Sequence, residues 1–237
     1  METGIADGEK AYAALSRIEK EWVNEWGFVH TRRTDISGES PFVFANDLLA
    51  IAAFKYGDPD LGWRMLKLAA RAPLEFGMLG AFDEAIPRSA NFIQLWSSAR
   101  FLEGVIEGLA GIEPRAAEHR VRLFPQLPKG LSEFALQNVL IGEHRLDLSC
   151  RREGNRETIT VIHQDGPCPL KCSVQILWGE GKRITVDGRR AALRRAVQTP
   201  PGREVVIVDC DVRPGDSLTI HVEVNHDQRR DSEACPG

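Results

Sequence analysis

The sequence lacks long apolar runs and the short motifs that identify several large protein classes. No apolar stretch approaches the ~18 residues that a membrane-spanning helix needs, so we expect no membrane partner. The first ten residues, METGIADGEK, have neither a basic start nor an apolar core, unlike a secretory signal. No phosphate-binding loop, dinucleotide fingerprint or nucleophile elbow is present. These absences favour a cytoplasmic protein that uses no cofactor.

Cysteine is scarce and irregularly spaced. The five cysteines are Cys150, Cys168, Cys172, Cys210 and Cys235. Cys168 and Cys172 do not form a CxxC pair, and no second Cys/His pair complements them. His144, His163 and His221 are scattered over expected strands without metal-ligand spacing. We therefore interpret the cysteines as free thiols of a reducing compartment and expect no metal site.

Charge of either sign is also modest. The net charge of −4 and the pI near 5.9 argue against a dedicated nucleic-acid or acidic-membrane binder. The short basic pairs, such as Arg189-Arg190, are interleaved with acids and are interpreted as solvated strand and turn positions. We expect no nucleic-acid partner.

Residues 1–112 show the three-to-four-residue spacing of apolar side chains that is typical of helices. The expected helices cover about 9–26, 44–56, 58–71 and 91–109. Asp58 suits an N-cap, Pro59 the first helical position, and Gly57 the end of the preceding helix. Asn91 with Gln94 resembles a capping box.

All four expected helices carry an apolar stripe, and those of the first and fourth contain the most residues. The stripe of the first contains Tyr12, Leu15, Ile18, Trp22 and Trp26. The stripe of the fourth contains Phe92, Trp96, Ala99, Leu102, Ile106 and Leu109. Gly104 and Gly108 lie one turn apart on the fourth helix, where glycine costs about 1 kcal/mol relative to alanine. The pair indicates that another helix packs very close there, although merely tolerated glycines also occur.

After Ile112 the period changes to two. Eight β-branched or alternating segments, among them FALQNVLIG, HRLDLSCRRE and ETITVIHQD, are separated mostly by Gly, Pro, Asn or Asp. Eight short strands at regular spacing predict an antiparallel β-sandwich. The predicted fold class is therefore α+β in two parts, with a helical part at 1–112, a sandwich at 113–225 and a disordered tail at 226–237.

Two long loops, 27–43 and 73–90, precede the second and fourth helices, and long loops in a compact domain are usually functional. If alternate helices lie inside and outside a ring, both loops emerge on one face. The stretches NEWGFVHTRR, AIAAFKYGDPDLGWRMLKLAA, GAFDEAIPRSANFIQLWSSARFLEGVIEGLAGIEP and VRLFPQLPKG carry a resemblance. Together they resemble the six-hairpin glycosidases, the (α/α)6 toroids of glucoamylases and bacterial glycogen-debranching, amylo-α-1,6-glucosidase-like enzymes.

A complete toroid has twelve helices, and this chain offers about four. The chain therefore resembles the last two hairpins with the appended sandwich, and the upstream helices are absent. The resemblance implies a truncated or split reading frame, or a missing N-terminal half of the toroid supplied by another chain. An open part-ring exposes apolar helix faces, so we expect the isolated chain to self-associate or to be poorly soluble.

The resemblance implies that Glu84, in FDEAIPRSA, is the general base of an inverting hydrolase that acts on α-glucosides or related oligosaccharides. The base activates a water molecule, and a second carboxyl group protonates the leaving oxygen. A helix N-terminus behind the loop favours the ionised base, although it stabilises any loop acid equally. Asp83 is the second choice. The general acid is expected upstream, so we expect no hydrolysis by this chain alone.

Substrate contacts are expected around this loop. Trp96 is suited to stack on the C–H face of a sugar, or else belongs to the apolar stripe. Gln94 is suited to bind a hydroxyl group, or else caps the helix. Arg32 and Asp35 in the first long loop supply hydroxyl contacts, or are solvated charges.

The family often places a tryptophan near the end of the first long loop, where this chain has Phe42 and Phe44. That departure leaves the sugar, the linkage and the oligomeric state open. A second reading, from another class, is a non-catalytic carbohydrate-binding or interaction module.

Overall fold

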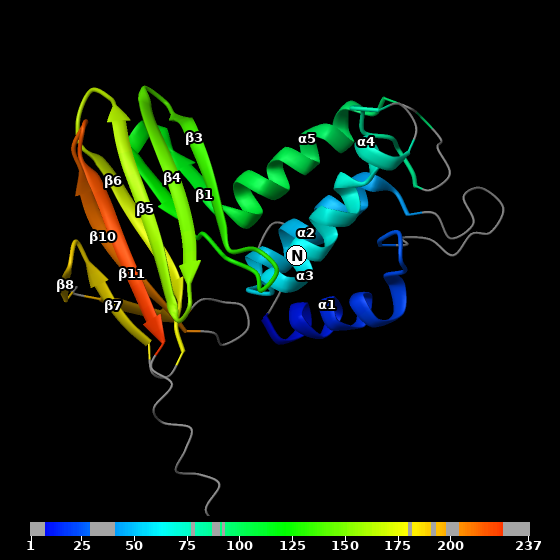
Figure 1. Cartoon of the computed structure of the whole chain (residues 1–237), viewed down its shortest axis with the longest axis horizontal. Coiled ribbons are helices and arrows are strands. Elements are labelled where there is room, and N and C mark those ends of the chain that lie inside the picture. Colours follow the sequence, from blue (N-terminus) through cyan, green and yellow to red (C-terminus); the bar gives the residue numbers. More distant parts are fainter. Residues whose placement is uncertain are drawn as a thin grey trace, which may run out of the picture. The chain divides into compact units, whose positions relative to one another are not determined.

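The computed structural model describes residues 8–28, 41–76, 79–86, 91, 93–179, 182–190, 193–197 and 204–224. The chain forms two compact units (Figure 1). One contains the helices with the short segment Pro128–Gly130, and the other contains the strands. The fold is thus α+β. Arg32, Asp35 and the predicted tail at 226–237 lie outside the described residues.

The helices of the first unit are α1 (Gly8–Trp22), α2 (Val43–Lys55), α3 (Pro59–Ala70), the short α4 (Ala72–Glu75) and α5 (Leu95–Glu103), which continues as a π-helical turn (Gly104–Leu109). Asp58 caps α3, because its Oδ1 accepts the N–H of Leu61 at 3.1 Å. Pro59 is the first residue of α3, and Gly57 has the positive φ of 71° that follows a helix end. These predictions are confirmed, whereas α4 lies within a segment predicted as loop.

Two helix boundaries differ from the prediction. The first helix ends at Trp22, and Trp26 beyond it packs edge-on against Phe76 with ring centroids 5.4 Å apart. The guanidinium of Arg71 lies 4.5 Å above the Trp26 ring. These contacts require a bend after α1, which explains why Trp26 leaves the predicted stripe.

The start of the fourth helix also differs. α5 begins at Leu95, not Asn91, and no side chain caps it. Gln94 instead accepts the hydroxyl of Ser97 and donates its backbone N–H to Phe82. The predicted capping box is therefore wrong, because the backbone at Gln94 pairs with the preceding loop.

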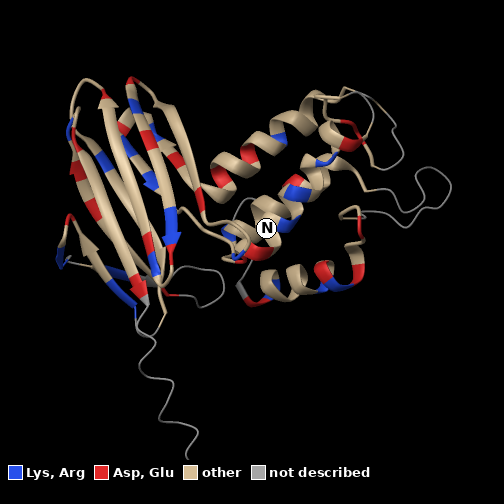
Figure 2. Ribbon diagram, in the orientation of Figure 1, with Lys and Arg blue, Asp and Glu red and all other residues tan. Residues whose placement is uncertain are grey.

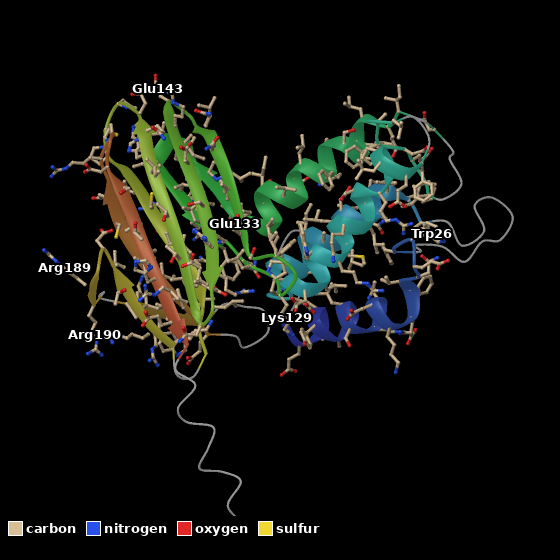
Figure 3. The ribbon with its side chains drawn as sticks, in the orientation of Figure 1. Trp26, Lys129, Glu133, Glu143, Arg189 and Arg190 are labelled. Atoms are coloured by element: carbon tan, nitrogen blue, oxygen red, sulfur yellow. The ribbon has the colours of Figure 1, made fainter. Side chains whose placement is uncertain are left out.

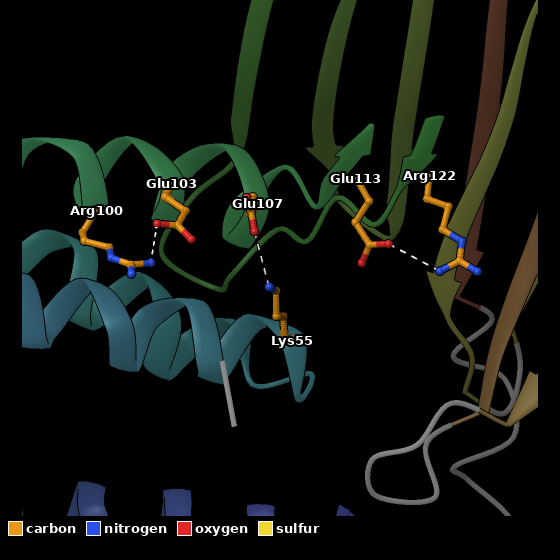
Figure 4. Close-up of polar contacts among 6 residues, drawn as sticks. All are labelled: Lys55, Arg100, Glu103, Glu107, Glu113 and Arg122. Atoms are coloured by element: carbon orange, nitrogen blue, oxygen red, sulfur yellow. Dashed lines mark hydrogen bonds and ion pairs between the residues drawn. The ribbon is translucent and has the colours of Figure 1, made fainter. Parts of the chain in front are cut away.

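Helix α2 forms the centre of the helical unit. Ten of its residues are buried, including Ala50, Ile51 and Phe54, and it contacts both α3 and α5. A helix that is apolar on all sides is a buried helix. An ion pair between Lys55 and Glu107, 3.3 Å apart, joins its end to the π-helical turn (Figure 4).

The glycines of the fourth helix mark close helix packing, as predicted. A Cβ at Gly104 would lie 2.7 Å from Leu66 Cδ2 on α3. A Cβ at Gly108 would lie 2.8 Å from Phe54 Cδ2 on α2. Gly62 of α3 also approaches this ring, and a Cβ there would lie 2.7 Å from the same Cδ2. Both glycines therefore pack against Phe54.

Most of the apolar stripe predicted for the fourth helix is exposed: Trp96 is 62% exposed, Leu102 59% and Ile106 39%, whereas Leu109 at its end is buried. The packed face carries Ser97, Gly104 and Gly108, because only small residues allow α2 and α3 to approach so closely. In α1, Tyr12 is likewise exposed, while Ala11 and Leu15 are buried.

The second unit contains two sheets (Figure 1). The five-stranded sheet has the order β1-β2-β6-β10-β9 and the six-stranded sheet the order β3-β4-β5-β11-β7-β8. Their bounds are β1 (Ile112–Arg115), β2 (Arg120–Leu123), β3 (Glu133–Ile141), β4 (His144–Glu153), β5 (Arg156–Asp165), β6 (Leu170–Leu177), β7 (Lys182–Val186), β8 (Arg189–Arg190), β9 (Arg194–Val197), β10 (Glu204–Val212) and β11 (Ser217–Val224).

All eight predicted strand segments are confirmed, and the short β1, β8 and β9 were missed. Most pairs are antiparallel, but β2 and β6 run parallel, so the prediction of an antiparallel arrangement is wrong for that pair. Buried and exposed side chains alternate along β4, where Leu146, Leu148 and Cys150 are buried. Basic and acidic side chains are interspersed on both units (Figure 2). Within the described residues, no helix is both long and apolar enough to span a membrane.

Candidate functional site

The loop that carries Glu84 is fixed on two sides. The N–H of Glu84 donates to the carbonyl of Asn91 at 3.1 Å, and the N–H of Gln94 donates to Phe82 at 2.8 Å. On the other side, the N–H of Val43 at the start of α2 donates to the carbonyl of Glu84 at 2.8 Å. The backbone of Glu84 is thereby tied to the central helix of the unit and to the segment that leads into α5.

Asp83 organises this loop from within. Its side chain is fully buried. Its Oδ1 accepts the N–H groups of Glu84 at 2.6 Å, Ala85 at 3.3 Å and Asn91 at 3.4 Å. Hydrogen bonds from N–H groups to a carboxylate are stronger than neutral ones, so they hold the turn in one shape. The geometry gives Asp83 a positioning role.

Glu84 differs from its neighbour. Its side chain is only partly buried. Within the described part of the chain, no side chain donates a hydrogen bond to its carboxylate. A carboxylate on a fixed backbone, with solvent access, is able to accept a proton from a bound water molecule.

A hollow of about 460 Å³ lies at the start of α5. It is lined by Asn91, Ile93, Gln94, Leu95, Trp96 and Ala99. Trp96 is 62% exposed, and its ring centroid lies 6.0 Å from that of Phe44. Phe44 lies 5.8 Å from Phe42, which extends the aromatic row. Asn91 connects the hollow to Glu84, since their backbones are hydrogen-bonded.

The structure separates the alternatives left open for Trp96 and Gln94. Trp96 is an exposed residue beside the hollow and is not a core residue. Gln94 is buried, and its side-chain oxygen binds Ser97, so it steadies the first turn of α5. Phe42 and Phe44, noted in the sequence only as replacements for a tryptophan, form the aromatic row with Trp96. The predicted contacts of Arg32 and Asp35 lie outside the described residues and stay predictions.

Sequence reasoning missed Asp47, on α2. Its side chain is fully buried, and neither carboxylate oxygen has a hydrogen-bond partner among the described residues. Burial disfavours the charged form and raises the pKa of Asp47 to about 8. The available signal was one acid, next to Asn46, in the mostly apolar stretch of ANDLLAIAAF. A carboxyl group that is neutral at pH 7 is unusual and is more common near functional sites than elsewhere.

Comparison with a solved structure supports the fold. The chain is similar to alpha-L-rhamnosidase from Dictyoglumus thermophilum with a TM-score of 0.53 and 9% identity, over 76% of this chain and 20% of that chain. A protein described as a kojibiose phosphorylase from human microbiome gives a TM-score of 0.40 at 12% identity, over 71% and 19% of the two chains, which is too low to support an argument.

Neither the family profiles nor the curated proteins contain a match to this sequence. The chain spans about a fifth of the length of the two similar structures. The part of the fold described above is therefore shared with a segment of a much larger glycosidase.

Proposed function

We propose that this chain is the C-terminal part of an inverting glycoside hydrolase that acts on α-linked oligosaccharides. Its helical unit supplies the last hairpins of an (α/α)6 toroid, and its two sheets form the β-sandwich that follows. One feature carries the proposal: Glu84 presents a carboxylate that no described side chain binds, from a fixed loop whose backbone pairs with Asn91 of a hollow that also contains the exposed Trp96.

The chemistry assigns each of these groups a task. Glu84 removes a proton from a water molecule, whose oxygen forms a bond to the anomeric carbon as the glycosidic bond breaks. Trp96 stacks on the C–H face of the sugar, and Asp83 keeps the Glu84 backbone in place. The leaving oxygen takes its proton from an acid on the opposite side of the sugar, roughly 6.5–9.5 Å from the base in inverting enzymes. That acid belongs to the upstream part of the toroid.

The exposed stripe on α5 supports a missing neighbour. Leu95, Ala99, Leu102 and Ile106 recur at a spacing of three to four residues and all are exposed. Contiguous exposed apolar surface marks an interaction site. We assign this stripe to contact with the upstream helices of the toroid, whether they are encoded in the same reading frame or in another chain.

The substrate is an α-linked glucoside or rhamnoside. The sequence resemblance favours an α-glucoside, and the similar solved structure is an alpha-L-rhamnosidase. Both sugars offer the apolar C–H face that an exposed tryptophan binds.

The test is hydrolysis by the assembled enzyme, made by co-expressing this chain with the upstream helical hairpins. p-Nitrophenyl α-glucoside and α-L-rhamnoside serve as the two substrates. We expect Glu84→Gln to lower kcat by about 10²–10⁴-fold, with KM little changed, because a general base contributes that much. Glu133→Gln, an exposed acid on β3, is the control and should keep full activity.

The aromatic row that ends in the exposed Trp96 also fits a non-catalytic carbohydrate-binding module. In that case the assembled protein binds oligosaccharides without cleaving them, and Trp96→Ala, not Glu84→Gln, abolishes binding. Hydrolysis that survives Glu84→Gln would overturn the assignment of the base.

A further inference from the structure

Three histidines that are far apart in the sequence meet at one end of the strand unit. His119 follows a short 3-10 turn (Ala116–Glu118), His144 is the first residue of β4, and His163 lies on β5. His119 Nδ1 is 2.9 Å from His144 Nε2, and His144 Nδ1 is 3.1 Å from His163 Nε2. The interpretation of the histidines as scattered is therefore wrong for His144 and His163.

The hydrogen bonds of this row determine which nitrogens carry protons. His163 Nδ1 lies 2.8 Å from the carbonyl of Val212, which can only accept, so this nitrogen is protonated. His163 Nε2 then accepts from His144 Nδ1. The lone pair of His144 Nε2 consequently faces His119.

Cys168 completes a cluster with two of these histidines. It lies in the connection between β5 and β6 and is partly exposed. Its Sγ and one ring nitrogen each of His119 and His144 all lie within 4.8 Å of one another. The β3–β4 turn that precedes His144 contains Glu143, labelled in Figure 3.

We propose that His119, His144 and Cys168 bind a Zn²⁺ ion, with a water molecule as the fourth ligand. Two imidazoles and a thiolate suit zinc, which binds nitrogen at about 2.0–2.1 Å and sulfur at about 2.3 Å in a tetrahedron. His119 is exposed and Cys168 partly exposed, so both side chains can rotate onto an ion that enters from solvent. Only His144 is buried, and it is the ligand already oriented.

The surroundings of His144 have the arrangement that a zinc-binding histidine requires. A ligand histidine usually donates its second N–H to a fixed acceptor, which sets its tautomer and orientation. His163 is that acceptor, and the carbonyl of Val212 fixes His163 in turn. A Cβ at Gly166 would lie 2.4 Å from His144 Nδ1 and 2.7 Å from His163 Nε2, so only glycine leaves room for the pair.

His119 is positioned by its backbone. Its φ of 48° is uncommon for a residue with a side chain, and such conformations cluster at functional sites. The carbonyl of His119 accepts the N–H of Lys171 on β6 at 2.9 Å, which holds this conformation. His119 is therefore kept opposite His144 by the parallel β2–β6 edge.

Zinc binding changes the proton positions of two of the ligands. The thiol of Cys168 loses its proton to solvent as the Zn–S bond forms. His119 moves its proton from Nδ1 to Nε2, which frees Nδ1 to bind the ion. One proton is released for each ion bound, and no oxidant or reductant takes part.

The test is a titration of the reduced, metal-free protein with Co²⁺, a spectroscopic probe for zinc sites, followed by displacement with Zn²⁺. We expect a thiolate-to-cobalt charge-transfer band that saturates at one equivalent and disappears when Zn²⁺ is added. Cys168→Ser should abolish the band, and His119→Gln should weaken binding strongly. Cys210→Ser, at a partly exposed cysteine on β10, is the matched control and should retain the band.

His163→Gln tests the positioning role. We expect it to weaken Co²⁺ binding by about 10–100-fold while the charge-transfer band at saturation persists, because loss of a supporting hydrogen bond has that effect. Absence of a saturable band in the wild-type protein would show that the histidines form only a hydrogen-bonded row. A band that survives Cys168→Ser would equally overturn the proposal. The site uses residues of the strand unit alone, so neither outcome depends on the glycosidase assignment.

Discussion

The carboxylate of Asp83 accepts the backbone N–H of Glu84 at 2.6 Å, so two adjacent acids in the chain serve opposite purposes. The first is buried and turned toward the backbone of its own loop, and the second is partly exposed. In this arrangement the carboxylate of Asp83 binds N–H groups of its own loop and so fixes the shape of the turn. The carboxylate of Glu84 is the one able to meet a water molecule.

Replacing Asp83 with alanine should destabilise the helical unit. The change leaves the N–H groups of Ala85 and Asn91 without this acceptor, while that of Glu84 keeps only the carbonyl of Asn91, and an unsatisfied buried group costs about 1–3 kcal/mol. Urea unfolding measures the loss. Asp83→Asn keeps a carbonyl oxygen and should lose less, so equal stability of Asp83→Ala and the wild type would contradict this role.

The buried Asp47 should make stability depend on pH. Its pKa is about 8 in the folded chain, above the value of 3.8 for a free side chain, because burial disfavours the charge. Between these values the folded state holds a proton that the unfolded state has lost. The free energy of unfolding therefore falls as the pH rises, by about 1.4 kcal/mol per pH unit, and levels off above pH ~8.

Asp47→Asn should remove this dependence. The amide has a similar size and does not ionise, so the variant should exceed the wild type in stability at pH 8 and differ little from it at pH 4. Urea unfolding at a series of pH values measures both. A wild type whose advantage over Asp47→Asn grew with pH would show that the folded chain holds Asp47 as a stabilised anion.

Gly108→Ala should destabilise the packing of α2 against α5. The new methyl group would lie 2.8 Å from Phe54, whose ring is fully buried and is also in close contact with Gly62. Overpacking costs about 1–3 kcal/mol, and the better helix propensity of alanine returns about 1 kcal/mol. Thermal unfolding should show a net loss.

The double variant Gly108→Ala, Phe54→Leu separates this collision from other effects. The smaller leucine makes room for the methyl group, so the two changes together should cost less than the sum of the single changes. Strict additivity would mean that Gly108 is not held against Phe54.

The exposed stripe of α5 should govern self-association. Leu102→Lys places a charge in the stripe and should shift the isolated chain toward monomer in sedimentation velocity. Leu140→Lys on β3, at a residue that is 70% exposed, is the matched control and should not. A shift produced equally by both would point to general solubility and not to a specific surface.

Local sequence signals predicted the elements but not which face of each is covered. Asp58, Pro59 and Gly57 act within one or two turns of backbone, so their roles follow from residue type alone. The period of the fourth helix correctly separates Leu102 and Ile106 from Gly104 and Gly108. Hydrophobicity then selected the wrong side as the packed one, because the close approach of two helices requires small residues.

The histidine cluster had no local signal at all. His119, His144 and His163 are brought together by the pairing of β4 with β5 and by the connection before β2, and no spacing along the chain encodes that pairing. Asp47 and the row of Phe42, Phe44 and Trp96 were likewise visible only as single residues. What links them is tertiary contact.

The hydrogen bond between Val43 and Glu84 has a consequence for protein engineering. It joins the carboxylate-bearing residue to the innermost helix, while the N–H of Ile86 is joined to Pro41. A redesign that shifts the start of α2 would therefore move the backbone of Glu84 with it.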